Sequence, residues 1–207
     1  MIKYIHKHSD ISYKNIVTYI ESEKELSVLD FLKLDINILK DIKKSLKAKK
    51  SSFKEYFIGS KTCEKIHIFI SKEKEYEKKV NFLGKSLPKL FKELTLISNN
   101  SEAQKLLLEV SQLSRYSFQD YKTKKKIIKT QVFCSIEEKK DLQNLEKKLD
   151  NICLARNLWE TPACDLTPEI FAQKVKNTKF KNIKVKVLKY KDIQKHKLGL
   201  IEWVGKI

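Results

Sequence analysis

The sequence predicts an α/β layered domain in which a mixed or parallel β-sheet is flanked by helices. Three observations lead to this prediction. Short segments rich in β-branched and aromatic residues alternate with segments of helical periodicity along most of the chain. One predicted strand, residues 66–70, is apolar on both of its faces. Hydrophobic residues make up 41% of the 207 residues, which is enough to form a buried core.

Four short segments are predicted to be strands of this sheet: residues 56–58, 66–70, 94–97 and 130–134. The second, Ile-His-Ile-Phe-Ile, has the pattern of a strand covered by helices on both sides. A further strand is expected at residues 183–187, where Ile183, Val185 and Val187 alternate with lysines and predict one wet face. Residues 1–34 hold short mixed apolar segments whose type the pattern does not decide.

Helical spacing of apolar side chains predicts two helices in the first half of the chain. Residues 35–50 place apolar side chains at steps of three and four, namely at Ile36, Leu39, Ile42 and Leu46. Residues 73–92 predict a second helix, interrupted or bent near Gly84 and Pro88.

Three more helices are predicted from their start signals. Ser101 with Gln104 forms a capping-box pattern, and Ser135 with Glu138 forms another before a longer helix. Thr167 is expected to cap a helix whose first residue is Pro168. The helix after Ser101 has an apolar stripe of Ala103, Leu106, Leu107, Val110 and Leu113. The helix after Ser135 has an apolar stripe of Leu142, Leu145, Leu149 and Ile152. The irregular stretch 160–165 is interpreted as a connector between two structural units.

The chain is strongly basic, with 44 Lys and Arg against 26 Asp and Glu and a net charge of +18. Clustered cations of this kind can bind nucleic-acid phosphates. All but two of the basic residues are lysine, the exceptions being Arg115 and Arg156, whereas base edges and phosphate forks are contacted best by arginine. The simplest interpretation is therefore a solvated lysine surface, and functional nucleic-acid binding is the alternative.

The sequence pattern excludes several classes of protein and of binding site. No apolar run approaches the ~20 residues of a membrane span, and residues 1–8 lack the apolar stretch of a secretory signal, so a soluble intracellular protein without a membrane partner is expected. The four glycines do not cluster into a phosphate loop. Cysteines lie far apart without metal-ligand spacing, so neither structural zinc nor a disulfide framework is expected: Cys63, Cys134, Cys153 and Cys164.

No nucleophile, acid–base pair or metal cage can be assembled from the chain. Of the histidines, His6 and His8 are interpreted as frayed surface residues, His67 as a core or edge residue and His196 as exposed. The acidic residues fit exposed helix faces or helix starts: Glu73, Glu75, Glu77, Glu137, Glu138, Asp141, Asp165 and Glu169. We therefore assign no catalytic residue and no metal ligand, and leave nucleic-acid-binding residues unknown.

The most specific signal is the run from Ala155 to Pro168, Ala-Arg-Asn-Leu-Trp-Glu-Thr-Pro-Ala-Cys-Asp-Leu-Thr-Pro. It resembles the linker of the leucyl (cytosol) aminopeptidases, and the similarity continues through 171–172, 184–188, 198–200 and 204–205. Residues 116–124, Tyr-Ser-Phe-Gln-Asp-Tyr-Lys-Thr-Lys, resemble that family's Tyr-x-Phe-x-x-Tyr-Lys stretch, and residues 66–70 resemble a strand placed before it. The chain departs from the family at Glu160 and Cys164, where asparagines are usual and close turns better.

This resemblance implies a macro-like α/β domain at residues 1–135, a long helix and linker at 136–166, and the start of a catalytic domain at 167–207. It further implies a cytoplasmic metallo-exopeptidase that assembles as a hexamer and holds two divalent ions, Zn or Mn, in a carboxy-terminal domain. The family's metal motifs lie beyond the Val204-Gly205 step, so none is carried over to this chain.

We therefore expect the non-catalytic, amino-terminal portion of such an enzyme, truncated near the domain junction and inactive alone. Apolar surface should be exposed around Leu198, Ile201, Trp203 and Val204. Two alternatives stay open: a basic nucleic-acid-binding module using residues 40–54, 122–129 and 174–197, and a structural subunit that docks to a separately encoded catalytic chain.

Overall fold

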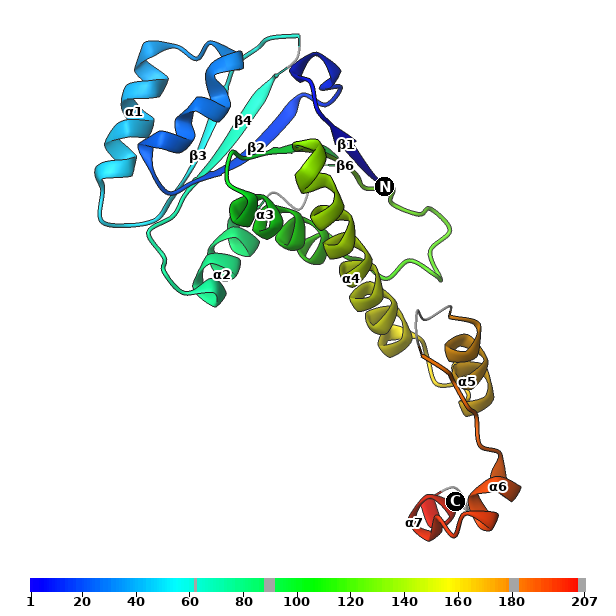
Figure 1. Cartoon of the computed structure of the whole chain (residues 1–207). Helices are drawn as coiled ribbons and strands as arrows, with labels where there is room; N and C mark the ends of the chain where they lie inside the picture. Colours follow the sequence, from blue (N-terminus) through cyan, green and yellow to red (C-terminus); the bar gives the residue numbers. More distant parts are fainter. Residues whose placement is uncertain (62, 88–91, 179–182, 205–207) are drawn as a thin grey trace. The chain divides into compact units, whose positions relative to one another are not determined.

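The computed structural model describes residues 1–61, 63–87, 92–178 and 183–204. For residues 202–204 it describes the backbone only. The chain forms two compact units, Met1–Leu154 and Ala155–Ile207. The first holds a sheet and its covering helices, and the second holds short helices (Figure 1). The predicted boundaries at residues 135 and 166 stay predictions.

A six-stranded sheet forms the centre of the first unit, in the order β1-β6-β5-β2-β4-β3. Its strands are β1 (Ile2–Ile5), β2 (Asn15–Ile20), β3 (Ser52–Phe57), β4 (Lys65–Ile70), β5 (Glu93–Ile97) and β6 (Lys129–Phe133). The paired strands run parallel except for β3, which lies antiparallel to β4. The register sets Ile16 of β2 opposite Ile66 of β4 on one side and Thr95 of β5 on the other. The prediction of a mixed sheet is confirmed.

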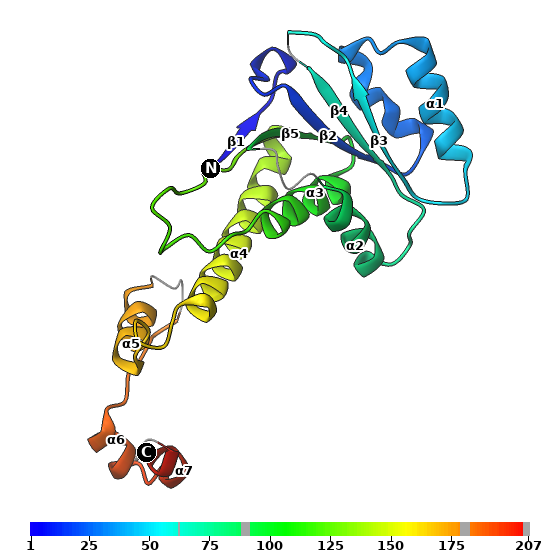
Figure 2. The same cartoon turned by 180° about the vertical axis from the view of Figure 1, so that it is seen from behind.

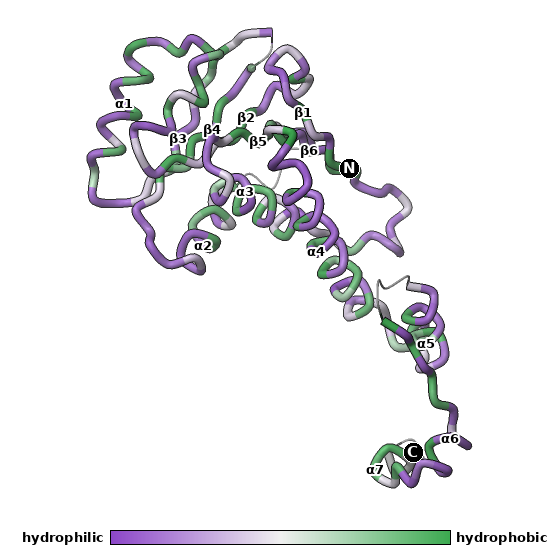
Figure 3. Tube along the Cα trace, viewed as in Figure 1, coloured by the Kyte–Doolittle hydropathy of each residue, from purple (hydrophilic) through white to green (hydrophobic). Residues whose placement is uncertain are grey.

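Helices cover both faces of the sheet (Figures 1 and 2). One face carries η2 (Glu23–Leu32) and α1 (Ile36–Lys47), and its core includes Ile16, Ile20 and Ile68. The other face carries α2 (Tyr76–Ser86), α3 (Ser101–Ser114) and α4 (Ile136–Glu160), with Val17 and Phe69 among its buried side chains. Successive strand residues point to opposite faces, so β2 and β4 place apolar side chains in both cores; green marks these apolar residues in Figure 3.

Most predicted helix starts are confirmed. The N–H of Glu138 donates to Oγ of Ser135, and the N–H of Ser135 donates to the Glu138 carboxylate, so the capping box before α4 is formed. The predicted cap at Ser101 is wrong, because Asn100 Oδ1 accepts from the N–H groups of Glu102 and Ala103. The side chain of Gln104 instead donates to the Phe133 carbonyl on β6.

Three other expectations differ from the structure. The helix predicted at 73–92 begins only at Tyr76, because after β4 the N–H of Ser71 donates to the Ile20 carbonyl and that of Lys72 to Oγ of Ser51. Gly84 lies inside α2 without interrupting it, and Pro88 lies outside the described residues. The segment 1–34, left unassigned, holds β1, β2 and η2. Residues 183–189 form no strand, and no described strand pairs with them.

The second unit contains α5 (Pro168–Asn177), α6 (Tyr190–Lys195) and α7 (Gly199–Val204). Thr167 caps α5, its Oγ1 accepting from the N–H of Ile170, and Pro168 is the first helical residue as predicted. Among its described side chains, residues 155–178 and 183–201, none is buried. This unit therefore has no core of its own in the part of the chain that the structure describes.

Candidate functional site

The carboxyl ends of β2 and β5 lie next to each other in the sheet, and the chain leaves them toward opposite faces. From β2 the chain continues into η2 and α1, which cover one face, whereas from β5 it continues into α3 on the other (Figure 1). Such a point, where neighbouring parallel strands diverge, is where open α/β sheets place their ligand crevices. The structure therefore directs attention to the residues that follow β2 and β5.

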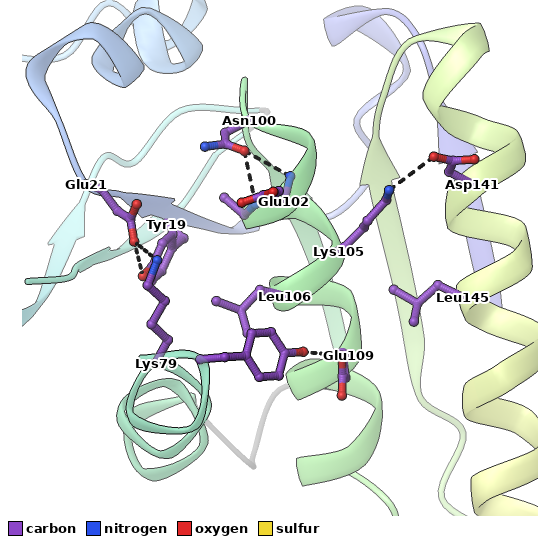
Figure 4. Close-up of a pocket in the computed structure, with 12 residues that line it drawn as sticks. Tyr19, Glu21, Lys79, Asn100, Glu102, Lys105, Leu106, Glu109, Asp141 and Leu145 are labelled. Carbon is purple, nitrogen blue, oxygen red and sulfur yellow. Dashed lines mark hydrogen bonds and ion pairs between the residues drawn. The ribbon is translucent and has the colours of Figure 1, made fainter. Parts of the chain in front are cut away.

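A cavity of about 620 Å³ opens at this point, between the end of β2 and the helices α2, α3 and α4. Its size falls within the range of small-molecule sites. Figure 4 shows its polar groups, with Tyr19, Glu21 and Lys79 meeting on one side and Lys105 reaching Asp141 on the other. The side chains that line it are Tyr19, Glu21, Tyr76, Lys79, Asn100, Glu102, Ala103, Lys105, Leu106, Glu109, Asp141 and Leu145.

The polar groups of the cavity are arranged in pairs. The Tyr19 hydroxyl donates to Oε1 of Glu21 at 2.7 Å, and the Lys79 ammonium lies 2.5 Å from the same atom. Lys105 pairs with Asp141 at 3.1 Å, joining α3 to α4. The Tyr76 hydroxyl donates to the carboxylate of Glu109, joining α2 to α3.

Both tyrosines of the cavity stay protonated over the physiological range. Burial raises the pKa of Tyr19, and the neighbouring Glu21 carboxylate adds to the rise. Burial and the hydrogen bond to Glu109 raise the pKa of Tyr76 to about 12. Their hydroxyl groups therefore act as hydrogen-bond donors and not as bases.

The histidines are placed individually, away from this cavity. His6 and His8 are exposed, as expected, but the expectation that they are frayed is wrong. His6 Nδ1 lies 2.6 Å from the Cys134 carbonyl oxygen. The His8 ring stacks on the rings of Phe31 and Phe133, with centroid distances of 4.0 and 4.3 Å. His67 is fully buried in β4, as expected, with Nδ1 3.4 Å from Glu55, and burial lowers its pKa. His196 is exposed.

The cysteines are free thiols, and two of them are buried. Burial raises the pKa of Cys63 and of Cys134 to about 11, so both are protonated at neutral pH. Cys153 is half-buried and Cys164 is exposed. Within the described ranges, no three His, Cys, Asp or Glu side chains come together as a metal site would require. The residues present there therefore do not fit a dinuclear centre.

The acidic residues considered from sequence have mostly local structural contacts. Glu73 accepts from Oγ of Ser51, Glu75 pairs with Lys78, and Glu138 completes the capping box of α4. Asp141 is the exception, since it lines the cavity. The cavity as a whole was missed from sequence, although the spacing of Glu102, Lys105, Leu106 and Glu109 could have marked one helix face.

The stretch 116–124 follows α3 as an ordered loop. Gln119 holds the loop closed, because its Nε2 donates to the Lys126 carbonyl and its Oε1 accepts from the Lys126 N–H. The preceding Arg115 is buried and donates to Oγ1 of Thr130 and to the Lys92 carbonyl. The rings of Phe118 and Tyr121 lie 5.6 Å apart.

The run 155–168 leaves α4 through a turn. Both the N–H and the hydroxyl of Thr161 donate to the Asn157 carbonyl, at 3.0 and 2.7 Å. The N–H groups of Asp165 and Leu166 donate to the Pro162 carbonyl. Backbone groups and Thr161 thus close this turn, although Glu160 and Cys164 stand where short amides were expected.

Of the apolar patch predicted near the end of the chain, Ile201 is exposed and Leu198 is half-buried. The side chains of Trp203 and Val204 lie outside the described residues. None of the helices in the described ranges is both long and apolar enough to cross a membrane.

Comparison with solved structures first shows the fold. A tomato leucine aminopeptidase mutant of known structure has a TM-score of 0.53 to this chain at 14% identity, over 86% of this chain and 42% of that one. The fold is thus the layered α/β fold found in a leucine aminopeptidase, and the predicted fold class is confirmed.

Sequence comparison then finds similarity to one family over part of the chain. Residues 153–206 match the model of the cytosol aminopeptidase family, catalytic domain. A probable cytosol aminopeptidase of Clostridium tetani is 36% identical over 118 residues, and probable cytosol aminopeptidase 1 of Shewanella oneidensis is 39% identical over 64. These matches cover 53% and 31% of this chain, but 24% and 13% of the relatives. The resemblance to the leucyl (cytosol) aminopeptidase family is confirmed.

Proposed function

We propose that the chain works as the amino-terminal, non-catalytic portion of a leucyl-aminopeptidase-type metallo-exopeptidase, which in full-length form removes N-terminal amino acids from peptides. Such an enzyme would act in the cytoplasm as a hexamer. The observation that carries the proposal is the second unit, which matches the family's catalytic-domain model yet has no buried side chain among its described residues.

Large apolar side chains of the second unit are open to solvent. Trp159 is 90% exposed and Leu200 85%, and the same holds to a lesser degree for Ile170, Phe171, Ile183, Val187, Tyr190 and Ile201. So many exposed apolar groups in one short segment are typical of a surface that another polypeptide covers. In the proposal the cover is the remainder of the family's catalytic domain, supplied in the same chain or as a separate subunit.

The metal chemistry of the proposed enzyme would belong to that remainder. The family's reaction uses two divalent ions, Zn or Mn, to polarise the scissile carbonyl and activate water. Consistent with this division, no three His, Cys, Asp or Glu side chains come together as a metal site would require within the described ranges.

Two measurements test the proposal. The purified chain, incubated with Mn²⁺ or Zn²⁺ and a leucyl chromogenic amide, is expected to give no turnover above the buffer blank. The chain is then mixed with a polypeptide corresponding to the unmatched carboxy-terminal part of the Clostridium tetani relative, and co-elution on gel filtration is expected. Phe171→Asp, in the exposed face of α5, should weaken that co-elution, whereas Lys140→Asp on the exposed surface of α4 should not.

Turnover that follows the chain alone through gel filtration, in proportion to its concentration, would refute the non-catalytic assignment. If Phe171→Asp and Lys140→Asp co-elute equally well with the added polypeptide, α5 is not the covered surface.

Nucleic-acid binding is the second candidate, and one observation favours it. The loop after α3 presents Lys122, Lys124 and Lys125 to solvent next to Tyr121, a residue that is 56% exposed. Cations beside an exposed ring are the elements of a sequence-tolerant single-strand platform. A gel shift with nucleic acid at rising salt concentration separates the two candidates. Nucleic-acid binding requires that the protein retard the nucleic acid at low salt and that this retardation be lost steeply as salt is added. An absence of retardation at low salt would exclude this candidate.

A further inference from the structure

The cavity at the end of β2 has a floor made by one stripe of α3. Glu102, Lys105, Leu106 and Glu109 follow each other at steps of three, one and three, so they lie along one face of the helix. Figure 4 shows Glu102 near the start of α3, Leu106 beyond it and Glu109 further along. Tyr76 and Lys79 of α2 form one wall, and α4 forms the other.

The charges of this cavity do not balance. Four carboxylates and two ammonium groups line it, and each ammonium is already paired, Lys79 with Glu21 and Lys105 with Asp141. The carboxylates of Glu102 and Glu109 are left without a cation. Glu109 accepts from the Tyr76 hydroxyl, and the Glu102 carboxylate has no hydrogen-bond or ion-pair partner among the residues that the structure describes.

The two uncompensated carboxylates are separated by an apolar span. Seven residues of α-helix set their Cα atoms about 10 Å apart along the groove. Between them lies Leu106, which is 4% exposed, and the adjoining walls add Leu145 and the exposed residue Tyr76. The groove thus presents two negative ends joined by an apolar floor with an aromatic edge.

We propose that this cavity binds a linear aliphatic polyamine. Two ammonium groups would pair with Glu102 and Glu109, and the methylene chain between them would lie on Leu106 and Leu145. The Tyr76 ring can add a cation–π contact. An anion is disfavoured by the carboxylate excess, and a wholly apolar ligand would supply no cation to the two carboxylates.

The positive charge of the rest of the chain makes polyamine binding a specific test of this cavity. With a net charge of +18, the protein repels cations over most of its surface. A polyamine that binds despite this repulsion must occupy a locally negative site, so weak general attraction does not explain a positive result.

The test is isothermal titration of the full chain with spermidine at low salt. Saturable binding with one site is expected, and Glu102→Gln and Glu109→Gln should each weaken it about tenfold, because each removes one charge-assisted pair. Butylamine, which carries the chain but only one ammonium, should bind at least about tenfold more weakly than spermidine. Circular dichroism checks that each variant is folded.

Glu169→Gln is the matched control. Glu169 is the second residue of α5, as Glu102 is of α3, and it is exposed in the other unit of the chain. Its substitution removes the same charge from the same helical position and should leave spermidine affinity unchanged. The proposal is overturned by an absence of spermidine binding, by equal affinities for spermidine and butylamine, or by a Glu169→Gln effect as large as that of Glu102→Gln.

Discussion

Asn100 caps α3, and its replacement by Ala is expected to destabilise the first unit much more than replacement of its neighbour Ser101. Asn100 Oδ1 accepts from the Glu102 N–H at 2.9 Å and from the Ala103 N–H at 3.4 Å. Its Nδ2 also donates to Glu25 at 3.4 Å, which ties the start of α3 to η2. For Ser101, the part of the chain that the structure describes shows no side-chain hydrogen bond.

The magnitude follows from these contacts. Losing an N-cap side chain costs about 1 kcal/mol, and the long contact with Glu25 adds a few tenths, so Asn100→Ala should lower the free energy of unfolding by about 1.5 kcal/mol. Ser101→Ala should stay within about 0.5 kcal/mol, because alanine is the better helix former at this position. With an m-value of about 2 kcal/mol/M, the urea midpoint should fall by about 0.7 M for Asn100→Ala alone.

Urea titration followed by far-ultraviolet circular dichroism measures both variants. Asn100→Asp serves as the conservative variant, since its carboxylate can accept the same two N–H groups and should recover most of the loss. If Ser101→Ala lowered the midpoint as far as Asn100→Ala, the cap would be at Ser101 and the assignment from the structure would be refuted.

Four more outcomes are expected. Burial lowers the pKa of His67 below its ordinary 6.5, so its contribution to stability is complete above about pH 6.5 and is lost as the pH falls; His67→Phe should flatten urea midpoints measured between pH 7.5 and 5.5. Arg115→Lys should cost about 1–3 kcal/mol in thermal unfolding, because lysine cannot donate to both Thr130 and Lys92. Trp159→Ala should change the stability of this chain by less than about 0.5 kcal/mol, because the side chain is 90% exposed. Amides of 183–187 should exchange rapidly in this chain and slowly once a covering polypeptide is bound, as hydrogen-exchange mass spectrometry can show.

Local signals predicted the elements whose partners are close in sequence. The capping box at Ser135 and the cap at Thr167 are formed because their hydrogen bonds join residues three apart. The same rule failed at Ser101, since Asn100 precedes it and is an equally good cap; the pattern alone does not decide between adjacent candidates. Strand β2 was missed although Ile16 to Ile20 is rich in β-branched and aromatic residues.

The cavity could not be predicted from the chain, because its lining comes from four elements distant in sequence. The lining residues include Tyr19 of β2, Lys79 of α2, Glu109 of α3 and Leu145 of α4. These elements come together only through the order of the strands in the sheet. What the sequence does contain is the face of α3, where two glutamates flank a leucine at helical spacing. The excess negative charge of that face can be recognised only from the structure, which shows that Lys79 and Lys105 are already paired with Glu21 and Asp141.

The expected strand at 183–187 and the exposed side chains of the second unit fit the same proposal, that another polypeptide covers this unit. Alternation of Ile183, Val185 and Val187 with lysine is a property of the sequence, but a strand also needs a neighbour to accept its backbone hydrogen bonds. The described residues supply no such neighbour, and Ile183 and Val187 stay exposed. A polypeptide that brought a sheet edge to this segment would satisfy its backbone and cover its apolar face together, which is the role given above to the remainder of the catalytic domain.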